Sequence, residues 1–253
     1  MLLQGKTMFV TGGSAGIGRA AAIGAARHGA DIAINYIGDP AGATSAVAKI
    51  EALGRRAIAI PGDVADAATA TDFVARALDH LGQLDLFLSN AGICPFHAFL
   101  DMPVETFERT MRVNLHGAYY MVQAAANAMV AQGTGGSIVA ISSVSALVGG
   151  EYQTHYTPTK AGVHSLMQSA AIALGRHGIR CNSILPGAIQ TDINKEDLAD
   201  PDKRAYMEKR ISLGRLGVPD DLVGPIVFLG SDMAAYVTGA ALLVDGGLFV
   251  NLQ

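Results

Sequence analysis

The stretch Thr7–Gly18, TMFVTGGSAGIG, joins an apolar run of strand length to a glycine-rich turn that opens a helix. Glycine lacks a Cβ, so backbone N–H groups at this turn can come close to a ligand, and the N-terminus of a helix favours negative charge. The pattern is typical of a site that binds a pyrophosphate. A tight strand-to-helix turn without a ligand is the alternative for a glycine cluster considered alone.

Apolar runs of strand length alternate with helical patterns along the rest of the chain. Strands are expected at Thr7–Val10, Asp31–Tyr36, Ala57–Ile60, Leu84–Leu88, Ser137–Ile141, Arg180–Leu185 and Ala241–Val244. Helices are expected at about Gly16–His28, Pro40–Leu53, Ala67–His80, Val104–Met111, Leu115–Ala131, His155–His177 and Asp220–Leu229. This alternation predicts an α/β fold, a single Rossmann-type, doubly wound domain over residues 1–253. Its seven-stranded sheet should be mostly parallel, with helices on both faces.

The segment at about 194–213 interrupts this rhythm. It is polar and rich in Asp, Glu, Lys and Arg. We interpret it as a helical insertion that covers a substrate pocket, and a solvated surface helix is the alternative.

Composition excludes several classes of partner. Half of the 253 residues are hydrophobic, the net charge is −4, and no basic run of nucleic-acid-binding type occurs. No uncharged apolar run reaches transmembrane length, and the N-terminus runs straight into a strand without a signal peptide. Cys94 and Cys181 lack metal-ligand spacing, so we expect two reduced thiols, no metal site and a cytoplasmic protein.

Tyr156 and Lys160 are four residues apart in a predicted helix, so their side chains lie on one face. A lysine beside a phenol stabilises the phenolate and lowers the tyrosine pKa. A base near neutral pH needs a shift of roughly 3 units, or about 4 kcal/mol. A unit charge about 4 Å away, at an effective dielectric near 20, supplies about 4 kcal/mol before desolvation is subtracted. One lysine is therefore barely sufficient, and a second cation would help.

The motifs together resemble the short-chain dehydrogenase/reductase family over essentially the whole chain. The glycine spacing TGxxxGxG begins at Thr11, and further matching residues follow successive strands. They are Asp63-Val64, Asn90-Ala91-Gly92, Asn114, Ser143, Tyr156, Lys160 and Pro186-Gly187. The carboxyl ends of the strands are where ligands of open α/β sheets bind.

The resemblance implies a catalytic tetrad of Asn114, Ser143, Tyr156 and Lys160. Tyr156 would be the general base, Ser143 would bind the reacting oxygen, and Lys160 would lower the tyrosine pKa and bind the nicotinamide ribose. Asn114, at a kink in its helix, would hold a water that links Lys160 to solvent. An exposed helical Tyr–Lys pair is the alternative if these two residues are considered alone.

The resemblance also implies a nicotinamide cofactor, whose oxidised form would be the second cation. Asp63 and Val64 would hold the adenine, although Asp63 could instead cap a helix. Asn90 and Gly92 would lie near the ribose, and Ile189 and Thr191 near the carboxamide and a phosphate. The complete expected cofactor set is Gly12, Ser14, Ala15, Gly16, Ile17, Gly18, Tyr36, Asp63, Val64, Asn90, Ala91, Gly92, Tyr156, Lys160, Pro186, Gly187, Ile189 and Thr191.

The residue at the end of the second strand indicates which cofactor is preferred. NAD-specific enzymes usually carry an acid there, which hydrogen-bonds the ribose 2′-OH. Tyr36 stands at that position, and Ala15 and Ile37 provide no cationic clamp for a 2′-phosphate. Arg19 is a further candidate, with a helix-surface role as the alternative. We expect NAD or NADP to be accepted, with a preference for NAD.

Within the family, several stretches resemble the L-rhamnose 1-dehydrogenases, which oxidise the anomeric hydroxyl of the sugar to a lactone. They are ICPFH at 93–97, QTH at 153–155, TDINKED at 191–197 and the ending from Leu243 to Gln253. A small sugar needs fixed hydrogen-bonding side chains, and a 6-deoxy sugar also needs an apolar wall. The expected substrate set is Phe96, Ser143, Ser145, Gln153, Tyr156, Thr191 and Asn194. Phe96 could instead belong to the core, and Gln153 could only cap the helix.

Other functions stay open from the sequence. A D-glucose or other aldose 1-dehydrogenase and a 3-oxoacyl thioester reductase are the enzymatic alternatives, and a cofactor-sensing regulator is the non-enzymatic one. The family's usual assembly implies a homotetramer. A stripe of small residues spaced by four is compatible with a helix–helix contact between subunits or with packing on the sheet. Its members are Ala161, Ser165, Ser169 and Ala173.

Overall fold

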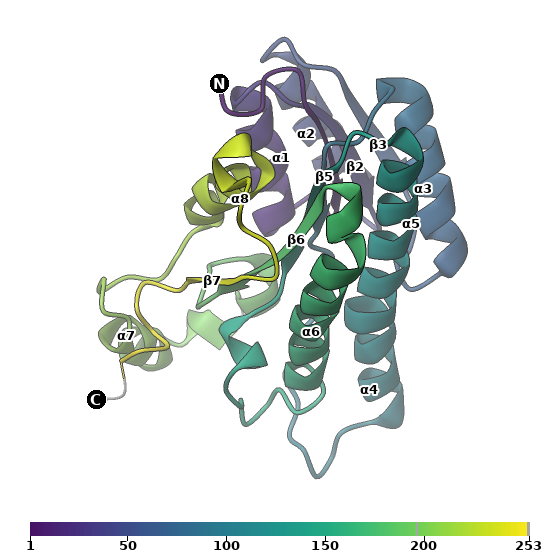
Figure 1. Cartoon of the computed structure of the whole chain (residues 1–253). Coiled ribbons are helices and arrows are strands. Elements are labelled where there is room, and N and C mark those ends of the chain that lie inside the picture. The colour runs from purple at the N-terminus through teal and green to yellow at the C-terminus, as the bar shows by residue number, and fades with distance from the viewer. Residues whose placement is uncertain (196, 252–253) are drawn as a thin grey trace.

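The computed structural model describes residues 1–195 and 197–251. Within them, seven strands form one sheet in the order β3-β2-β1-β4-β5-β6-β7, and every neighbouring pair is parallel (Figure 1). The strands are β1 Thr7–Thr11, β2 Asp31–Tyr36, β3 Ala57–Pro61, β4 Leu86–Ser89, β5 Gly136–Ile141, β6 Ile179–Pro186 and β7 Ala241–Val244. The Rossmann-type sheet is thus confirmed, and it is wholly rather than mostly parallel.

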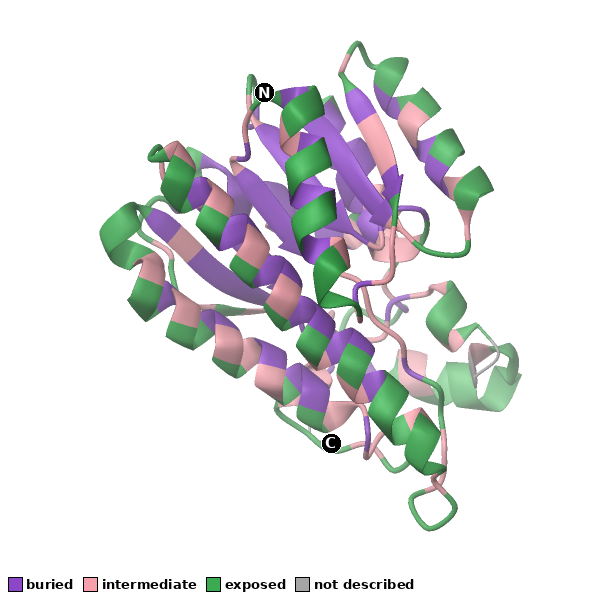
Figure 2. Cartoon of the chain, turned by 90° about the vertical axis from the view of Figure 1, so that its right-hand side faces the viewer, coloured by how far each residue is buried: buried purple, intermediate pink, exposed green. Residues whose placement is uncertain are grey.

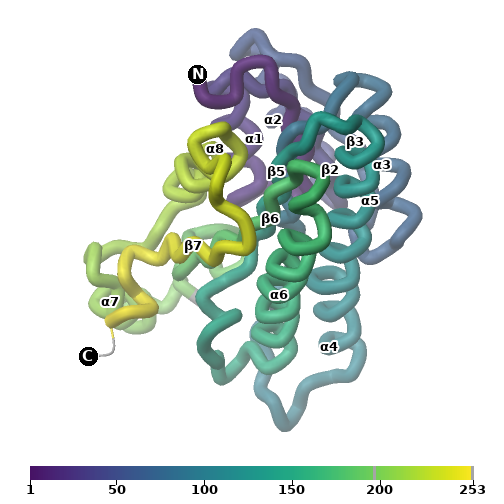
Figure 3. Tube along the Cα trace, in the orientation of Figure 1, coloured from purple at the N-terminus to yellow at the C-terminus, as the bar shows by residue number. Residues whose placement is uncertain are grey.

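Helices cover both faces of the sheet (Figure 3). They are α1 Gly16–Arg27, α2 Pro40–Glu51, α3 Ala67–Leu81, α4 Val104–Met111, α5 Gly117–Gln132, α6 Thr157–Leu174, α7 Pro201–Arg210 and α8 Val223–Gly230. Apolar residues of α1, α2 and α8 form one core cluster with the sheet, and those of α3, α5 and α6 form a second cluster. Because both faces are covered, the central strands β1 and β4 are buried along their whole length (Figure 2).

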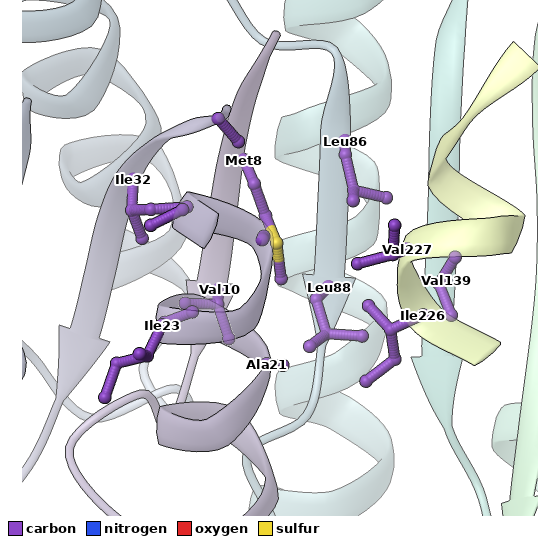
Figure 4. Close-up of a cluster of buried hydrophobic side chains, with 14 of the residues drawn as sticks. Met8, Val10, Ala21, Ile23, Ile32, Leu86, Leu88, Val139, Ile226 and Val227 are labelled. Carbon is purple, nitrogen blue, oxygen red and sulfur yellow. The ribbon is translucent and has the colours of Figure 1, made fainter. Parts of the chain in front are cut away.

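The first cluster illustrates the packing (Figure 4). Met8 and Val10 of β1 and Leu88 of β4 project towards α1 and α8, where they meet Ile226 and Val227. All five side chains are almost inaccessible to solvent. Burial of such a side chain contributes about 1.5–3 kcal/mol, so this layer holds the carboxyl ends of β1 and β4 in place.

Two sequence-based boundaries differ from the structure for identifiable reasons. The fourth strand begins at Leu86 instead of Leu84, because the Leu84 N–H donates to Oε1 of Gln132 (2.9 Å) and does not enter the sheet. The interval between the helices expected at 104–111 and 115–131 is a π-helical turn, Arg112–His116, which joins α4 to α5. This irregular turn carries Asn114, the residue expected at a kink.

The polar segment after β6 contains two short 3-10 turns, Asp192–Asn194 and Asp197–Ala199, followed by α7. Ile211 and Leu216, which follow α7, pack against Leu248 near the end of the chain, so the two segments lie side by side (Figure 1). Glu196, Leu252 and Gln253, which belong to the stretches compared above, lie outside the described residues. Nowhere in 1–195 or 197–251 is a helix both long enough and apolar enough to cross a membrane.

Candidate active site

A cavity of about 730 Å³ lies at the carboxyl ends of the strands. Its wall includes every residue of the expected substrate set and most of the expected cofactor set. The expected cofactor residues that line it are Gly12, Ser14, Ala15, Gly16, Ile17, Asn90, Ala91, Gly92, Tyr156, Lys160, Pro186, Gly187, Ile189 and Thr191. Loops that are far apart in the sequence therefore meet at one cavity, large enough for a small-molecule site.

The glycine-rich turn has a conformation that side chains would disturb. Gly12 and Gly16 have φ of +66° and +52°, a region that other residues rarely adopt. A Cβ at Gly18 would lie 2.2 Å from the Gly12 carbonyl oxygen. Ala15, which precedes α1, provides no side-chain cap for the helix N-terminus, and the first turn carries no acid. This bare, cavity-lining helix end fits a pyrophosphate, which its N–H groups and dipole would hold.

Asn90 ties the end of β4 to this turn. Its Nδ2 donates to the carbonyls of Thr11 (2.9 Å) and Gly12 (3.1 Å), and the Thr11 hydroxyl accepts from the backbone N–H groups of Asn90 and Ala91. The side chain of Asn90 thus holds the glycine loop, a role that the sequence did not reveal.

Gly18, Tyr36, Asp63 and Val64 do not line the cavity. Asp63 forms an ion pair with Arg109 of α4 (2.9 Å), and its other carboxylate oxygen accepts from the Ala65 N–H. The helix cap considered for Asp63 is provided by Asp66. Asp63 therefore does not cap α3, and its adenine contact stays a prediction.

The loop after β6 reaches across to the glycine turn. The Thr191 side chain lies 3.5 Å from the position of a Cβ at Gly16. Asn194 Oδ1 accepts from the Thr191 N–H (3.0 Å), and its Nδ2 donates to the Ile189 carbonyl (2.8 Å). Asn194 thus shapes this loop as well as lining the cavity. Its predicted contact with substrate would have to use the amide N–H and the oxygen lone pair that these two hydrogen bonds leave unused.

Tyr156 and Lys160 are adjacent at the start of α6. The Lys160 Nζ lies 5.5 Å from the centre of the Tyr156 ring and donates to the Ile141 carbonyl (2.9 Å). Lys160 is 4% exposed, although its side chain reaches the cavity wall. The pair is therefore not the exposed helical pair that the sequence left as an alternative.

Burial dominates the titration of both groups. It raises the pKa of Tyr156 above its ordinary value; a negative charge on Cys94 would act in the same direction, and the hydrogen bond with Ser143 acts against it. Burial also lowers the pKa of Lys160 to about 8. In the chain by itself the net direction is upward, because desolvation disfavours the phenolate. The expectation that Lys160 lowers the Tyr156 pKa stays a prediction.

The depressed Lys160 pKa predicts a pH-dependent stability. Between about pH 8 and the unfolded value near 10.4, the unfolded chain binds a proton that the folded chain does not, so folded-state stability rises with pH. We expect the unfolding free energy of the wild type, relative to Lys160→Met, to increase between pH 8 and pH 10 by roughly 2 kcal/mol, at about 1.4 kcal/mol per pKa unit, since the folded-state group is still half protonated at pH 8. Urea unfolding at pH 8 and pH 10 measures it, and a constant difference would contradict the prediction.

Asn114 is buried within the π-helical turn, and both ends of its side-chain amide are hydrogen-bonded to the chain. Its Oδ1 accepts from the Ile93 N–H and its Nδ2 donates to the Ile93 carbonyl, both at 2.8 Å. Nδ2 also donates to the Thr159 hydroxyl (3.3 Å), which in turn donates to the Tyr156 carbonyl (2.6 Å). The side chain thus links the loop after β4 to the start of α6. Its role in holding a water stays a prediction.

Some cavity-lining residues were not anticipated individually. Leu198, Tyr206 and Met207 belong to the polar segment, and Cys94 follows β4. The apolar side chains within an otherwise charged helix were the available signal for the first three. Side chains of the segment expected as a helical insertion thus line the cavity, and its role in covering a substrate pocket stays a prediction. Within the described residues, no three His, Cys, Asp or Glu side chains are placed to hold a metal.

Comparison with known proteins agrees with this geometry. A family model described as enoyl-(acyl carrier protein) reductase matches residues 12–249. A Sphingomonas protein named L-rhamnose 1-dehydrogenase (NAD(P)(+)) is 75% identical over 252 residues, covering 100% of this chain and 99% of its own. The chain belongs to the short-chain dehydrogenase/reductase family.

Two further members of the short-chain dehydrogenase/reductase family extend the comparison. An Azotobacter vinelandii protein, also named L-rhamnose 1-dehydrogenase (NAD(P)(+)), is 62% identical and covers 100% of both chains. The crystal structure of a short-chain type dehydrogenase/reductase from Mycobacterium marinum has a TM-score of 0.92 at 36% identity, covering 97% of this chain and 96% of its own.

Proposed function

We propose that this chain oxidises L-rhamnose, or a related aldose, at the anomeric carbon to the aldonolactone, with NAD or NADP as the hydride acceptor. The observation that carries the proposal is the 75% identity, over the whole chain, with the Sphingomonas L-rhamnose 1-dehydrogenase. The chemistry of the cavity supports it, because Tyr156, Lys160 and Ser143 line the same cavity as the uncapped N-terminus of α1.

In this proposal Tyr156 is the general base that accepts the proton of the anomeric hydroxyl while the C1–H bond breaks. Ser143 donates a hydrogen bond to the same oxygen and stabilises its developing charge. When bound, the oxidised nicotinamide accepts the hydride, so the hemiacetal carbon loses two electrons and becomes the lactone carbonyl. Lys160 would bind the ribose and stabilise the phenolate, and Asn114 would hold the water that carries the proton outwards.

The base strength of Tyr156 then depends on its surroundings. Burial raises its pKa in the chain by itself. Positive charge beside the phenolate lowers that pKa, as does a hydrogen bond to the phenolate. In this proposal the cationic, oxidised cofactor adds to Lys160 in making Tyr156 an effective base.

We further propose that NAD and NADP are both accepted, with a preference for NAD. The sequence predicts no cationic side chain at positions 15 and 37 to bind the 2′-phosphate of NADP. Both residues there, Ala15 and Ile37, are exposed and uncharged. Arg19 donates to the Ser45 hydroxyl (3.0 Å) on α2. The names of the two relatives, which specify NAD(P)(+), support the acceptance of both cofactors.

The substrate end of the cavity has the composition that a deoxy sugar needs. Phe96 is 41% exposed and lines the cavity, so it is not a core residue and provides an apolar wall. Ser145 and Gln153 present a hydroxyl and an amide to the same space. We propose that Phe96 contacts the methyl group of the sugar and that the polar side chains contact its hydroxyls.

A substrate panel tests the proposal. We expect kcat/KM for L-rhamnose, L-mannose and L-lyxose to exceed that for D-glucose at least about tenfold, since a polar pocket left with unpaired groups loses 1–3 kcal/mol per group. Formation of reduced nicotinamide, followed by absorbance with NAD and with NADP, measures it. Preference for D-glucose, or for a 3-oxoacyl thioester, would refute the rhamnose assignment. A preference of several orders of magnitude for one cofactor would refute relaxed cofactor choice.

The homotetramer and the cytoplasmic location stay proposals based on the family. Ala161, Ser165, Ser169 and Ala173 of α6 are exposed, so the small-residue stripe does not pack on the sheet. Its exposure supports a contact with another subunit, and a monomeric mass in solution would contradict that contact.

A further inference from the structure

Three side chains from separate segments meet at the substrate end of the cavity. The Gln153 Nε2 donates to the Cys94 Sγ (3.5 Å), and the Ser145 hydroxyl donates to the Gln153 Oε1 (3.3 Å). Cys94 follows β4, Ser145 lies in the turn after β5, and Gln153 precedes α6. All three line the cavity, and Cys94 is 7% exposed.

The backbone around Gln153 directs its side chain to this place. The Gln153 carbonyl accepts from the N–H groups of Tyr156 (2.8 Å) and Thr157 (2.9 Å), so the main chain anchors the start of α6. The side chain is therefore not needed as a helix cap. A Cβ at Gly150 would lie 2.5 Å from the Gln153 Oε1. The absence of a side chain at position 150 thus leaves the room in which the amide sits.

The contacts continue to the residues proposed for the chemistry. The Ser145 N–H donates to the Ser143 Oγ (3.1 Å), and Ser143 is hydrogen-bonded to Tyr156. Gln153 therefore stands between a buried thiol on one side and the Ser145–Ser143 pair on the other.

We propose that Cys94 is a positioning residue for substrate specificity, which holds the carboxamide of Gln153 against rotation so that it meets the sugar hydroxyls in a fixed place. This inference rests on the proposed sugar oxidation and deepens it. A free glutamine side chain has many rotamers, and ordering them on binding weakens affinity. Cys94 and Ser145 hold the amide at both ends before the sugar arrives. One N–H and one carbonyl lone pair are not used by these two contacts and can bind hydroxyl groups.

The test is a double-mutant cycle in the full-length enzyme. The variants are Cys94→Ala, Cys94→Ser, Gln153→Ala and the Cys94→Ala/Gln153→Ala double variant. We expect Cys94→Ala to raise KM for L-rhamnose about three- to tenfold, the range of one net hydrogen bond, with kcat changed less than about twofold. Cys94→Ser, which keeps an acceptor, should recover part of the loss. In the Gln153→Ala background, Cys94→Ala should change KM no further.

Cys181→Ala is the matched control, because this second buried thiol lies in β6 and does not line the cavity. It should leave KM for the sugar unchanged, and KM for the cofactor should be unchanged in both single cysteine variants. A KM increase by Cys94→Ala that persists in the Gln153→Ala background would overturn the proposal, since Cys94 would then act directly. An unchanged KM in Cys94→Ala would overturn it too.

A second measurement separates this inference from the sugar assignment. If the wild type oxidises a different aldose, the same cycle applies to that sugar. The side-chain amide signal of Gln153, assigned in ¹⁵N-glutamine-labelled protein by its loss in Gln153→Ala, needs no substrate. It should indicate one ordered amide in the wild type and rotational averaging in Cys94→Ala. An ordered signal in both proteins would overturn the positioning role even if L-rhamnose is the substrate.

Discussion

Replacing Tyr156 by phenylalanine should lower kcat about a thousandfold, while the protein still folds and binds its cofactor. The substitution removes only the hydroxyl that takes the proton, and general base catalysis contributes typically about 10²–10⁴-fold. The ring continues to fill the cavity wall beside Lys160, so little packing is lost. Initial rates measured by the absorbance of reduced nicotinamide give kcat, and titration calorimetry gives cofactor affinity.

Tyr236→Phe is the control for this prediction. Tyr236 is fully exposed and does not line the cavity, so its hydroxyl should be dispensable for turnover. More than a few per cent of wild-type kcat in Tyr156→Phe would show that another group accepts the proton.

Gly18→Ala should weaken cofactor binding at least about a hundredfold. The added Cβ would meet the Gly12 carbonyl oxygen at 2.2 Å and the Asn90 Nδ2 at 2.5 Å, the two groups that are hydrogen-bonded to each other. The glycine loop must therefore move, and overpacking of this kind costs typically about 1–3 kcal/mol, before the loss of aligned N–H groups is counted. Fluorescence titration with reduced nicotinamide cofactor measures the change in Kd.

The matched control is Gly175→Ala, at the end of α6. That glycine has a helical φ of −55°, and a Cβ there would meet nothing within 4 Å. Alanine should be tolerated and should stabilise slightly, by up to about 1 kcal/mol of helix propensity. Equal cofactor affinity in Gly18→Ala and the wild type would show that the loop does not hold the pyrophosphate.

Most of the fold could be predicted from the sequence, because strand and helix periods are local properties. The bounds expected for the second and last strands agree with the structure to the residue. Leu84 was placed in a strand because it is apolar, although its N–H pairs with the side chain of Gln132, 48 positions away. Such a partner cannot be read from a local pattern.

The candidate site was predicted as a set of residues and less well as a set of contacts. Most of the motifs that follow successive strands line one cavity, since the ends of parallel strands share one edge of the sheet; Asp63-Val64 and Asn114 do not. Asp63 was expected as an adenine contact or a cap, and the structure shows it paired with Arg109. The choice of ion-pair partner depended on how α4 packs beside the end of β3.

The sequence by itself determined the order of the elements, the family, and the glycine-rich turn that opens the first helix. These properties follow from residue type and spacing, which act over a few neighbouring positions. Only the tertiary structure decided the direction of the Tyr156 pKa, the burial of Lys160, and the engagement of Gln153 by Cys94 and Ser145. Desolvation and side-chain contacts depend on segments far apart in the chain, so they exist only once the sheet has brought those segments together.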